Sequence, residues 1–139
     1  MTHETNLRII LRAIGSVSLF ATVFVAVPYS WMDAIHQWLG MGNLPDAPIV
    51  GYLARSTSAF YAIFGGLLWV VSFEILRYRP IIHYIGGVTL VLGIALLVID
   101  WTAGLPLFWR IAEGPFVIVL GAVLLYFSRS GQHGDVHGA

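Results

Sequence analysis

The sequence contains no cysteine and few charged residues. Without a thiol, the chain cannot carry out thiol–disulfide chemistry, hold an iron–sulfur cluster or form a disulfide. This excludes the thiol-based quinone reductases among small four-helix membrane enzymes. The net charge is zero and there is no basic run, so nothing in the sequence favours nucleic-acid binding.

What the sequence does contain is apolar. Of its 139 residues, 58% are hydrophobic and 10% are charged, and the mean hydropathy is +0.84, outside the range of ordinary soluble domains. A membrane-spanning helix needs roughly 20 mostly apolar residues. Four segments reach or approach that length, at about residues 7–27, 49–76, 80–100 and 114–128. The sequence therefore predicts an all-α fold, a four-helix transmembrane bundle, as one integral membrane domain over residues 1–130.

The arginines predict how the chain is oriented. Cytoplasmic flanks of membrane helices carry the positive excess. Five arginines (Arg8, Arg12, Arg77, Arg79 and Arg129) fall on one side and two (Arg55 and Arg110) on the other. Both termini are therefore predicted to be cytoplasmic, in a multi-pass protein whose first segment is an uncleaved anchor. Residues 131–139 are rich in glycine and polar residues and are predicted to form a disordered cytoplasmic tail, where His133 and His137 give only a weak metal signal.

The loop after the first segment, "PYSWMDAIHQWLGMGNLPDAP", has helical periodicity. Trp31, Ala34, Ile35, Trp38 and Leu39 recur at the spacing of one helix face. We expect a short amphipathic helix that lies in the membrane interface with two tryptophans on its apolar face.

The two halves of the sequence resemble each other. When "RIILRAIGSVSLF" is aligned with "RPIIHYIGGVTLV", the apolar and small residues of the two segments coincide at several positions. The coinciding pairs of this alignment include Gly15/Gly86. A second alignment, which sets Arg55 against Arg110, also brings Gly66 opposite Gly121. This pattern predicts two duplicated helical hairpins.

Small residues in the long segments predict close helix packing. Ser58, Ala62 and Gly66 form a row at four-residue spacing, and Gly86 and Gly121 lie in later segments. Such residues let a neighbouring helix approach closely, within the bundle or between protomers.

Most of the remaining charge gathers at the predicted outer end of the bundle. Arg55 lies roughly 9 Å inside the second segment at 1.5 Å per residue, and a charge at that depth needs a partner. The cluster comprises Asp33, His36, Asp46, Arg55, Asp100, Arg110 and Glu113. One interpretation is structural pairing, of Arg55 with Asp100 or Glu113 and of Arg110 with Glu113 at helical spacing. The other is an outward-facing polar pocket that binds a lipid headgroup, a quinone or a small solute.

Two further residues have alternative interpretations. His36 has Asp33 three residues away on the same helical face, so it belongs either to the polar side of the interfacial helix or to a catalytic or metal site. Glu74 is either an acid of a proton-coupled transporter or an interfacial partner of Arg77.

The topology and the pattern of small residues carry a family resemblance, without a diagnostic motif. The second segment is entered through "ARSTSAFYAIFGGLLW", and "RYRP", "IDWTAGLP" and "EGP" follow. With four spans and an elaborated first outer loop, residues 7–127 resemble the DoxX-like group of small bacterial four-helix membrane proteins. The resemblance implies the bacterial inner (plasma) membrane, and either quinone-dependent oxidation or an assembly role. It identifies no catalytic residue.

Two functions follow from the sequence. The first is an accessory, assembly or structural subunit that packs with itself or with a membrane partner, because no nucleophile–base pair, nucleotide loop or metal cluster is recognisable. The second is a quinone- or lipid-binding protein that uses the outer polar cluster. Small-solute transport ranks below it, and the pattern assigns no catalytic residue, metal or cofactor.

Overall fold

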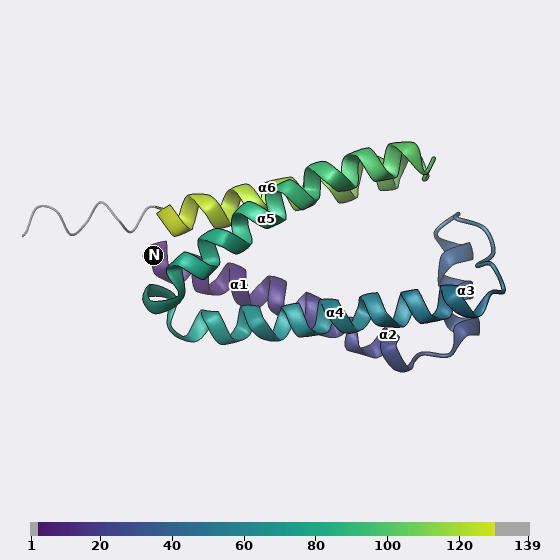
Figure 1. Cartoon of the computed structure of the whole chain (residues 1–139), viewed down its shortest axis with the longest axis horizontal. Coiled ribbons are helices and arrows are strands. Elements are labelled where there is room, and N and C mark those ends of the chain that lie inside the picture. The colour runs from purple at the N-terminus through teal and green to yellow at the C-terminus, as the bar shows by residue number, and fades with distance from the viewer. Residues whose placement is uncertain (1–2, 130–139) are drawn as a thin grey trace, which may run out of the picture. The chain divides into compact units, whose positions relative to one another are not determined.

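The computed structural model describes residues 3–129, and its elements are labelled in Figure 1. They are α1 (His3–Phe20), α2 (Thr22–Ala26), α3 (Tyr29–Trp38), α4 (Pro48–Phe73), α5 (Ile75–Thr102) and α6 (Leu107–Arg129). The predicted all-α fold, with four long apolar helices and a short helix in the first loop, is confirmed. The predicted tail and its two histidines lie outside the described residues.

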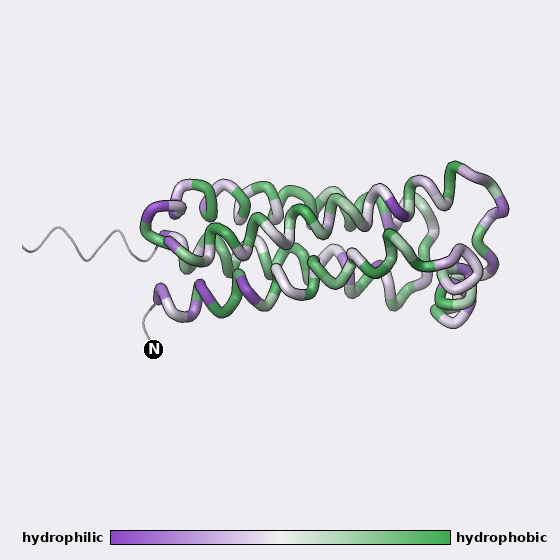
Figure 2. The backbone as a smooth tube through the Cα atoms, turned by 90° about the horizontal axis from the view of Figure 1, so that it is seen from below, coloured by the Kyte–Doolittle hydropathy of each residue, from purple (hydrophilic) through white to green (hydrophobic). Residues whose placement is uncertain are grey.

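Four helical stretches are long and apolar enough to cross a membrane. They cover His3–Ala26, where α1 and α2 form one span, and then the whole of α4, α5 and α6. Hydropathy along the backbone agrees, because the long helices are mostly apolar and hydrophilic residues gather towards helix ends and loops (Figure 2). The chain is a small multi-pass integral membrane protein.

The helix boundaries differ from the predicted ones at two prolines. The third span begins at Ile75 rather than near residue 80, so Pro80 lies inside α5, and Pro115 likewise lies inside α6, which begins at Leu107. A proline removes one backbone hydrogen bond, but membrane helices tolerate it because neighbouring helices and local adjustments compensate. Ile75 and Ile82 on either side of Pro80 are buried, so packing holds the helix together across it.

The described chain divides into two compact units, each of which is treated by itself. The N-terminal unit comprises residues 12–70, and the C-terminal unit comprises residues 3–11 and 71–129. The second half of α1, all of α2 and α3, and nearly all of α4 belong to the first unit. The second contains α5 and α6 together with the start of α1, whose Leu7 and Leu11 are buried.

In the N-terminal unit, α1 and α4 meet at two glycines. A methyl group at Gly65 would lie 2.6 Å from the carbonyl oxygen of Gly15, and one at Gly15 would lie 3.0 Å from that of Gly65. Beside this contact, Trp69 Nε1 donates a 3.3 Å hydrogen bond to Ser16 Oγ, and the Arg12 guanidinium lies 5.0 Å from the Trp69 ring centre. The missing side chains let the backbones touch, which is the use of small residues in membrane helix pairs.

In the C-terminal unit, α5 and α6 pack along a longer seam of the same kind. A methyl group added to Gly121 would lie 2.5 Å from the backbone nitrogen of Leu90, and one at Gly93 would lie 2.6 Å from that of Ile118. Gly114 is equally close to the Leu97 side chain. Positions 90, 93 and 97 of α5 therefore face positions 121, 118 and 114 of α6, in antiparallel register.

The two hairpins use equivalent glycines on their first helices. Gly15 and Gly86, which the alignment places opposite each other, both lie where the two helices of their own hairpin come close together. On the second helices the close contacts are made by Gly65 and Gly121, whereas a methyl group at Gly66 would meet nothing within 4 Å. The packing residue of α4 in this contact is thus Gly65, one position before the predicted Gly66.

Candidate functional site

The polar side chains of α3 hold the following loop against the helix. Asp33 Oδ1 accepts a 2.7 Å hydrogen bond from the Leu44 backbone N–H, and its Oδ2 accepts one of 2.8 Å from Gln37 Nε2. Tyr29 donates its hydroxyl hydrogen to the Pro45 carbonyl, at 2.6 Å. Together with His36, these two side chains of α3 fix residues 42–45 of the loop.

His36 belongs to this loop-fixing set. Its Nδ1 lies 2.8 Å from the Gly42 carbonyl oxygen. A carbonyl only accepts, so Nδ1 carries the hydrogen, and Nε2 of a neutral ring keeps the free lone pair. Asp33, three residues earlier, bonds to Leu44 and Gln37, so the two side chains do not form the histidine–carboxylate pair of a general base.

The end of α3 shows why this loop begins where it does. Gly40 has a φ of 75°, in the left-handed region that glycine adopts without strain. Its N–H bonds to the Gln37 carbonyl, and the Met41 N–H bonds back to that of His36. These two bonds make a Schellman motif, which ends the helix and turns the chain towards the loop.

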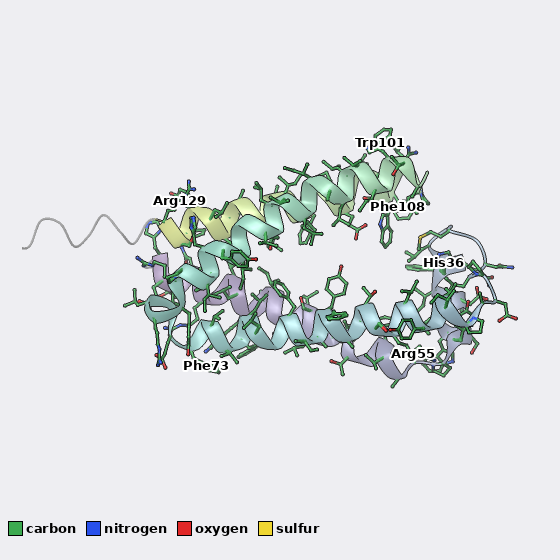
Figure 3. All side chains as sticks on the ribbon, in the orientation of Figure 1. His36, Arg55, Phe73, Trp101, Phe108 and Arg129 are labelled. Atoms are coloured by element: carbon green, nitrogen blue, oxygen red, sulfur yellow. The ribbon has the colours of Figure 1, made fainter. Side chains whose placement is uncertain are left out.

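Arg55 lies on α4 (Figure 3). It bonds to the end of the preceding span. Its Nη2 donates a 3.3 Å hydrogen bond to the carbonyl oxygen of Val27, directly after α2. The last carbonyls of a helix lack intrahelical partners and carry partial negative charge, so a guanidinium there satisfies both needs. Arg55 is in the N-terminal unit and its predicted acidic partners are in the C-terminal unit, so that pairing stays a prediction.

The pKa of the Tyr29 hydroxyl reflects the charges near the loop. Partial burial raises the pKa of its hydroxyl, and the nearby carboxylates of Asp46 and Asp33 raise it further. The neutral hydroxyl can donate to the Pro45 carbonyl, whereas the phenolate cannot. Asp46 itself is exposed.

The remaining predicted residues lie at the end of the C-terminal unit next to its 103–106 loop. The register of the α5–α6 seam, continued by one turn, brings residues 100 and 101 of α5 level with residues 110 and 111 of α6. Burial decides which of them face the seam. Asp100 is 2% exposed whereas Trp101 is 58% exposed, and Ile111 is 61% exposed whereas Arg110 is half-buried. Asp100 and Arg110 are therefore the seam residues.

These two side chains do not form an ion pair with each other. The Asp100 Oδ2 atom is buried and has no hydrogen-bond partner among the described residues, and the same holds for Arg110 Nε. The Arg110 guanidinium instead lies 4.6 Å from the ring centre of Trp101, in a cation–π contact. Unbonded buried polar atoms are costly, so two of them at one level of the seam make a candidate site; Arg8 Nε and Arg79 Nε of the same unit are also unbonded, so the carboxylate of Asp100 is the distinctive member.

Glu113 also has a partner other than the expected one. Its Oε2 accepts a hydrogen bond from the indole N–H of Trp109, one turn earlier on α6. Within this unit no ion pair joins it to Arg110, although the two are three residues apart. By contrast, the interfacial pair expected between Glu74 and Arg77 is present, with 3.3 Å between Oε2 and Nη1.

Sequence reasoning missed a polar contact at the opposite end of the C-terminal unit. His83 Nδ1 lies 2.9 Å from Ser128 Oγ, and the Ser128 hydroxyl donates to the Leu125 carbonyl at 3.0 Å. The serine hydrogen is therefore used by the backbone, and Oγ accepts from the histidine. In a serine nucleophile the hydroxyl would instead donate to the histidine, so this is a structural contact. Its residues are 45 apart, and no local spacing signals them.

The site residues thus fall into two groups. Asp33, His36, Asp46 and Arg55 are in the N-terminal unit, and Asp100, Arg110 and Glu113 are in the C-terminal unit. No group of three metal-ligating side chains occurs among residues 3–129. Comparisons with protein-family models, with curated proteins and with solved structures gave no match for this chain.

Proposed function

We propose that the protein is an accessory or assembly subunit of a bacterial membrane complex, of the DoxX-like type. The observation that carries this proposal is that the polar side chains near the loop of the N-terminal unit are bonded within the protein itself. Asp33, His36, Tyr29 and Arg55 each bond to the chain's own backbone. A catalytic site needs polar groups free to act on a substrate, whereas these groups shape a folded surface.

That surface is suited to the membrane interface. Trp31, Ile35 and Trp38 of α3 are exposed, and Trp38 is 84% exposed. Tryptophan is enriched both at headgroup level and at the centres of protein interfaces. The bonded loop behind α3 holds this face in place for a partner subunit or for a second copy of the chain.

Cross-linking from α3 tests the accessory role. Because the chain has no cysteine, a single cysteine can carry a maleimide with a photoreactive benzophenone. We expect Ser30→Cys and Ala34→Cys to give the same protein adduct in native membranes. Leu76→Cys, exposed in the first turn of α5, is the matched control. Adducts to lipid alone from both α3 positions, or equal protein adducts from the control, would remove the support for this proposal.

The same absence of cysteine allows a test of orientation. We propose that both termini are cytoplasmic and that the loop after α3 is outside, in the inner (plasma) membrane, on the strength of the arginine distribution. In intact cells, a membrane-impermeant thiol reagent should label Asn43→Cys but not Ser130→Cys. The reverse pattern would invert the proposed topology.

A second candidate function is a quinone- or lipid-binding membrane protein. The observation that favours it is the unbonded, buried carboxylate oxygen of Asp100 beside the seam-facing Arg110. Charged residues within membrane helices are costly and commonly mark ligand sites. Native mass spectrometry of the detergent-purified protein should reveal a retained lipid or quinone that is lost in Asp100→Asn. Retention of the same ligand by the folded variant would contradict this second function. Small-solute transport has less support. A transporter would need a polar path from Arg55 to Glu74, and the mostly apolar residues 60–73 between them do not supply one.

A further inference from the structure

At the loop end of the α5–α6 seam, one acceptor and one donor are unbonded at the same level. Asp100 Oδ2 lacks a donor and Arg110 Nε lacks an acceptor. The acceptor belongs to an acidic side chain and the donor to a basic one. A ligand that satisfies both must therefore present a cation with N–H groups and an anion, held close together.

The depth of these residues narrows the class of ligand. Asp100 lies two residues before the end of α5 at Thr102, and Arg110 lies three residues after the start of α6 at Leu107. At 1.5 Å per residue both are within about 5 Å of a helix end, which is the level of the lipid headgroups. The exposed Trp101 next to Asp100 fits this level, where tryptophan is enriched.

We propose that this end of the α5–α6 seam binds the headgroup of an aminophospholipid, with its ammonium group on Asp100 and its phosphate on Arg110. The inference rests on the second candidate function and names its ligand class. It does not depend on the accessory role.

The chemistry distinguishes this headgroup from the others that a membrane offers. A choline headgroup carries the same charges, but its trimethylammonium group has no N–H to donate to the Asp100 carboxylate. A glycerol headgroup has hydroxyl donors but no cation, so Asp100 would keep an unbalanced negative charge. Quinone carbonyl oxygens only accept, so they serve Arg110 and leave Asp100 Oδ2 unbonded.

Arg110 supplies the movable part of the site. Its guanidinium lies over the Trp101 ring, a contact worth less than a charge-assisted bond to phosphate. Rotation of this long side chain away from the ring would redirect its donors towards a phosphate. In the free protein the Arg110 guanidinium lies on the Trp101 ring, and in the lipid-bound protein it binds the phosphate.

The test is headgroup competition on the wild-type protein. The purified chain is exchanged into micelles with equal amounts of phosphatidylethanolamine, phosphatidylcholine and phosphatidylglycerol of identical acyl chains, and retained lipid is counted by native mass spectrometry. We expect retention of the ethanolamine lipid about tenfold above each of the others, the size of one charge-assisted hydrogen bond. Stepwise N-methylation of the ethanolamine should reduce retention at each step, because each methyl group replaces one donor.

Variants localise the effect. Asp100→Asn removes the charge that pairs with the ammonium and should abolish the preference for ethanolamine. Arg110→Gln should lower retention of all three lipids, because all three share the phosphate. Glu4→Gln is the matched control: it neutralises an acid of the same unit, in a half-exposed pair with Arg8, and should retain the preference.

Equal retention of the three headgroups by the wild-type protein would overturn the proposal, even if the variants failed to fold. A preference that survives in folded Asp100→Asn would overturn it too. If quinone is retained in an Asp100-dependent manner while the headgroups are not distinguished, the aminophospholipid is wrong and the second candidate function stands. If neither lipid nor quinone is retained, both fail.

Discussion

The two units close their helix pairs in the same way, but they differ in whether the polar side chains next to their loops are all bonded. In the N-terminal unit, α1 and α4 touch at Gly15 and Gly65, and in the C-terminal unit α5 and α6 touch along a seam that includes Gly121. Beyond the glycines, Arg55 in the first unit bonds to a helix-end carbonyl. In the second unit, Asp100 keeps an unbonded buried oxygen.

Equivalent packing combined with different polar bonding separates structural residues from candidate binding residues. Each unit ends a helix with the same device, since Gly104 after α5 has a φ of 69° and repeats the Schellman motif of Gly40 after α3. The loop after α3 is long and supplies backbone groups that use up the nearby polar side chains. The 103–106 loop is short and its side chains leave Asp100 and Arg110 unsatisfied. The difference in loop length therefore accounts for the difference in availability.

The glycine seam should give the largest effect on stability. We expect Gly121→Ala to cost about 1–3 kcal/mol of unfolding free energy, because the new methyl group would press on the Leu90 backbone, which cannot rotate away. Gly87→Ala, on the same seam helix pair but with open space at its Cβ, should be neutral or slightly stabilising. Unfolding in mixed detergent micelles measures both. Equal losses in the two variants would contradict the proposed backbone contact.

Substitutions of Arg55 and Asp100 should differ in their effect on the stability of the protein. Arg55→Ala removes the donor to the Val27 carbonyl and should cost about 1–2 kcal/mol. Asp100→Asn removes a charge whose Oδ2 has no hydrogen-bond partner and should leave the unfolding midpoint nearly unchanged or raise it. The same unfolding assay compares them. A large loss in Asp100→Asn with none in Arg55→Ala would reverse the assignment of structural and available residues.

The loop after α3 should loosen without unfolding the helices. Asp33→Ala removes the acceptor of the Leu44 N–H, at a cost of about 1 kcal/mol, so hydrogen exchange in residues 40–47 should rise. Asp46→Asn is the control, because Asp46 is exposed and bonds to no part of this loop that the structure describes. Unchanged exchange in Asp33→Ala would mean that the carboxylate does not hold the loop.

Tyr29 should give the smallest effect, and only at high pH. Its pKa is raised above the ordinary value, so the stability that it contributes is complete below the unfolded pKa of about 10 and is lost as pH rises through the folded pKa. The difference between the absorbance titration curves of the wild-type protein and of Tyr29→Phe isolates the ionisation of this hydroxyl. We expect a midpoint above 10 that falls in Asp46→Asn, and a midpoint below 10 would contradict the contributions of burial and the carboxylates.

The fold was predictable from hydropathy and periodicity, but the helix ends were not. Four apolar segments and the face of α3 appear directly in the sequence. Pro80 and Pro115 gave misleading boundaries, because packing against neighbouring residues outweighs one lost hydrogen bond. The four-residue row of Ser58, Ala62 and Gly66 pointed to Gly66, whereas the contact of α4 with α1 uses Gly65, and one residue turns a helix by about 100°.

The candidate site was less predictable, because its bonds are non-local. Helical spacing placed Asp33 beside His36, yet the partners are backbone groups of Leu44 and Gly42, which depend on how the loop folds. The spacing of Arg110 and Glu113 likewise predicted a pair, but the rings of Trp101 and Trp109 compete for them. Only the register of α5 and α6 together with the burial of Asp100 reveals that this residue faces the seam.

The most direct test compares lipid retention and stability in Arg55→Ala and Asp100→Asn, by native mass spectrometry of detergent-purified protein. The account predicts that Arg55→Ala unfolds more readily but keeps its bound ethanolamine lipid, whereas Asp100→Asn folds normally and loses the preference for that lipid. Loss of the lipid in folded Arg55→Ala, with full retention in Asp100→Asn, would contradict the division between the two units.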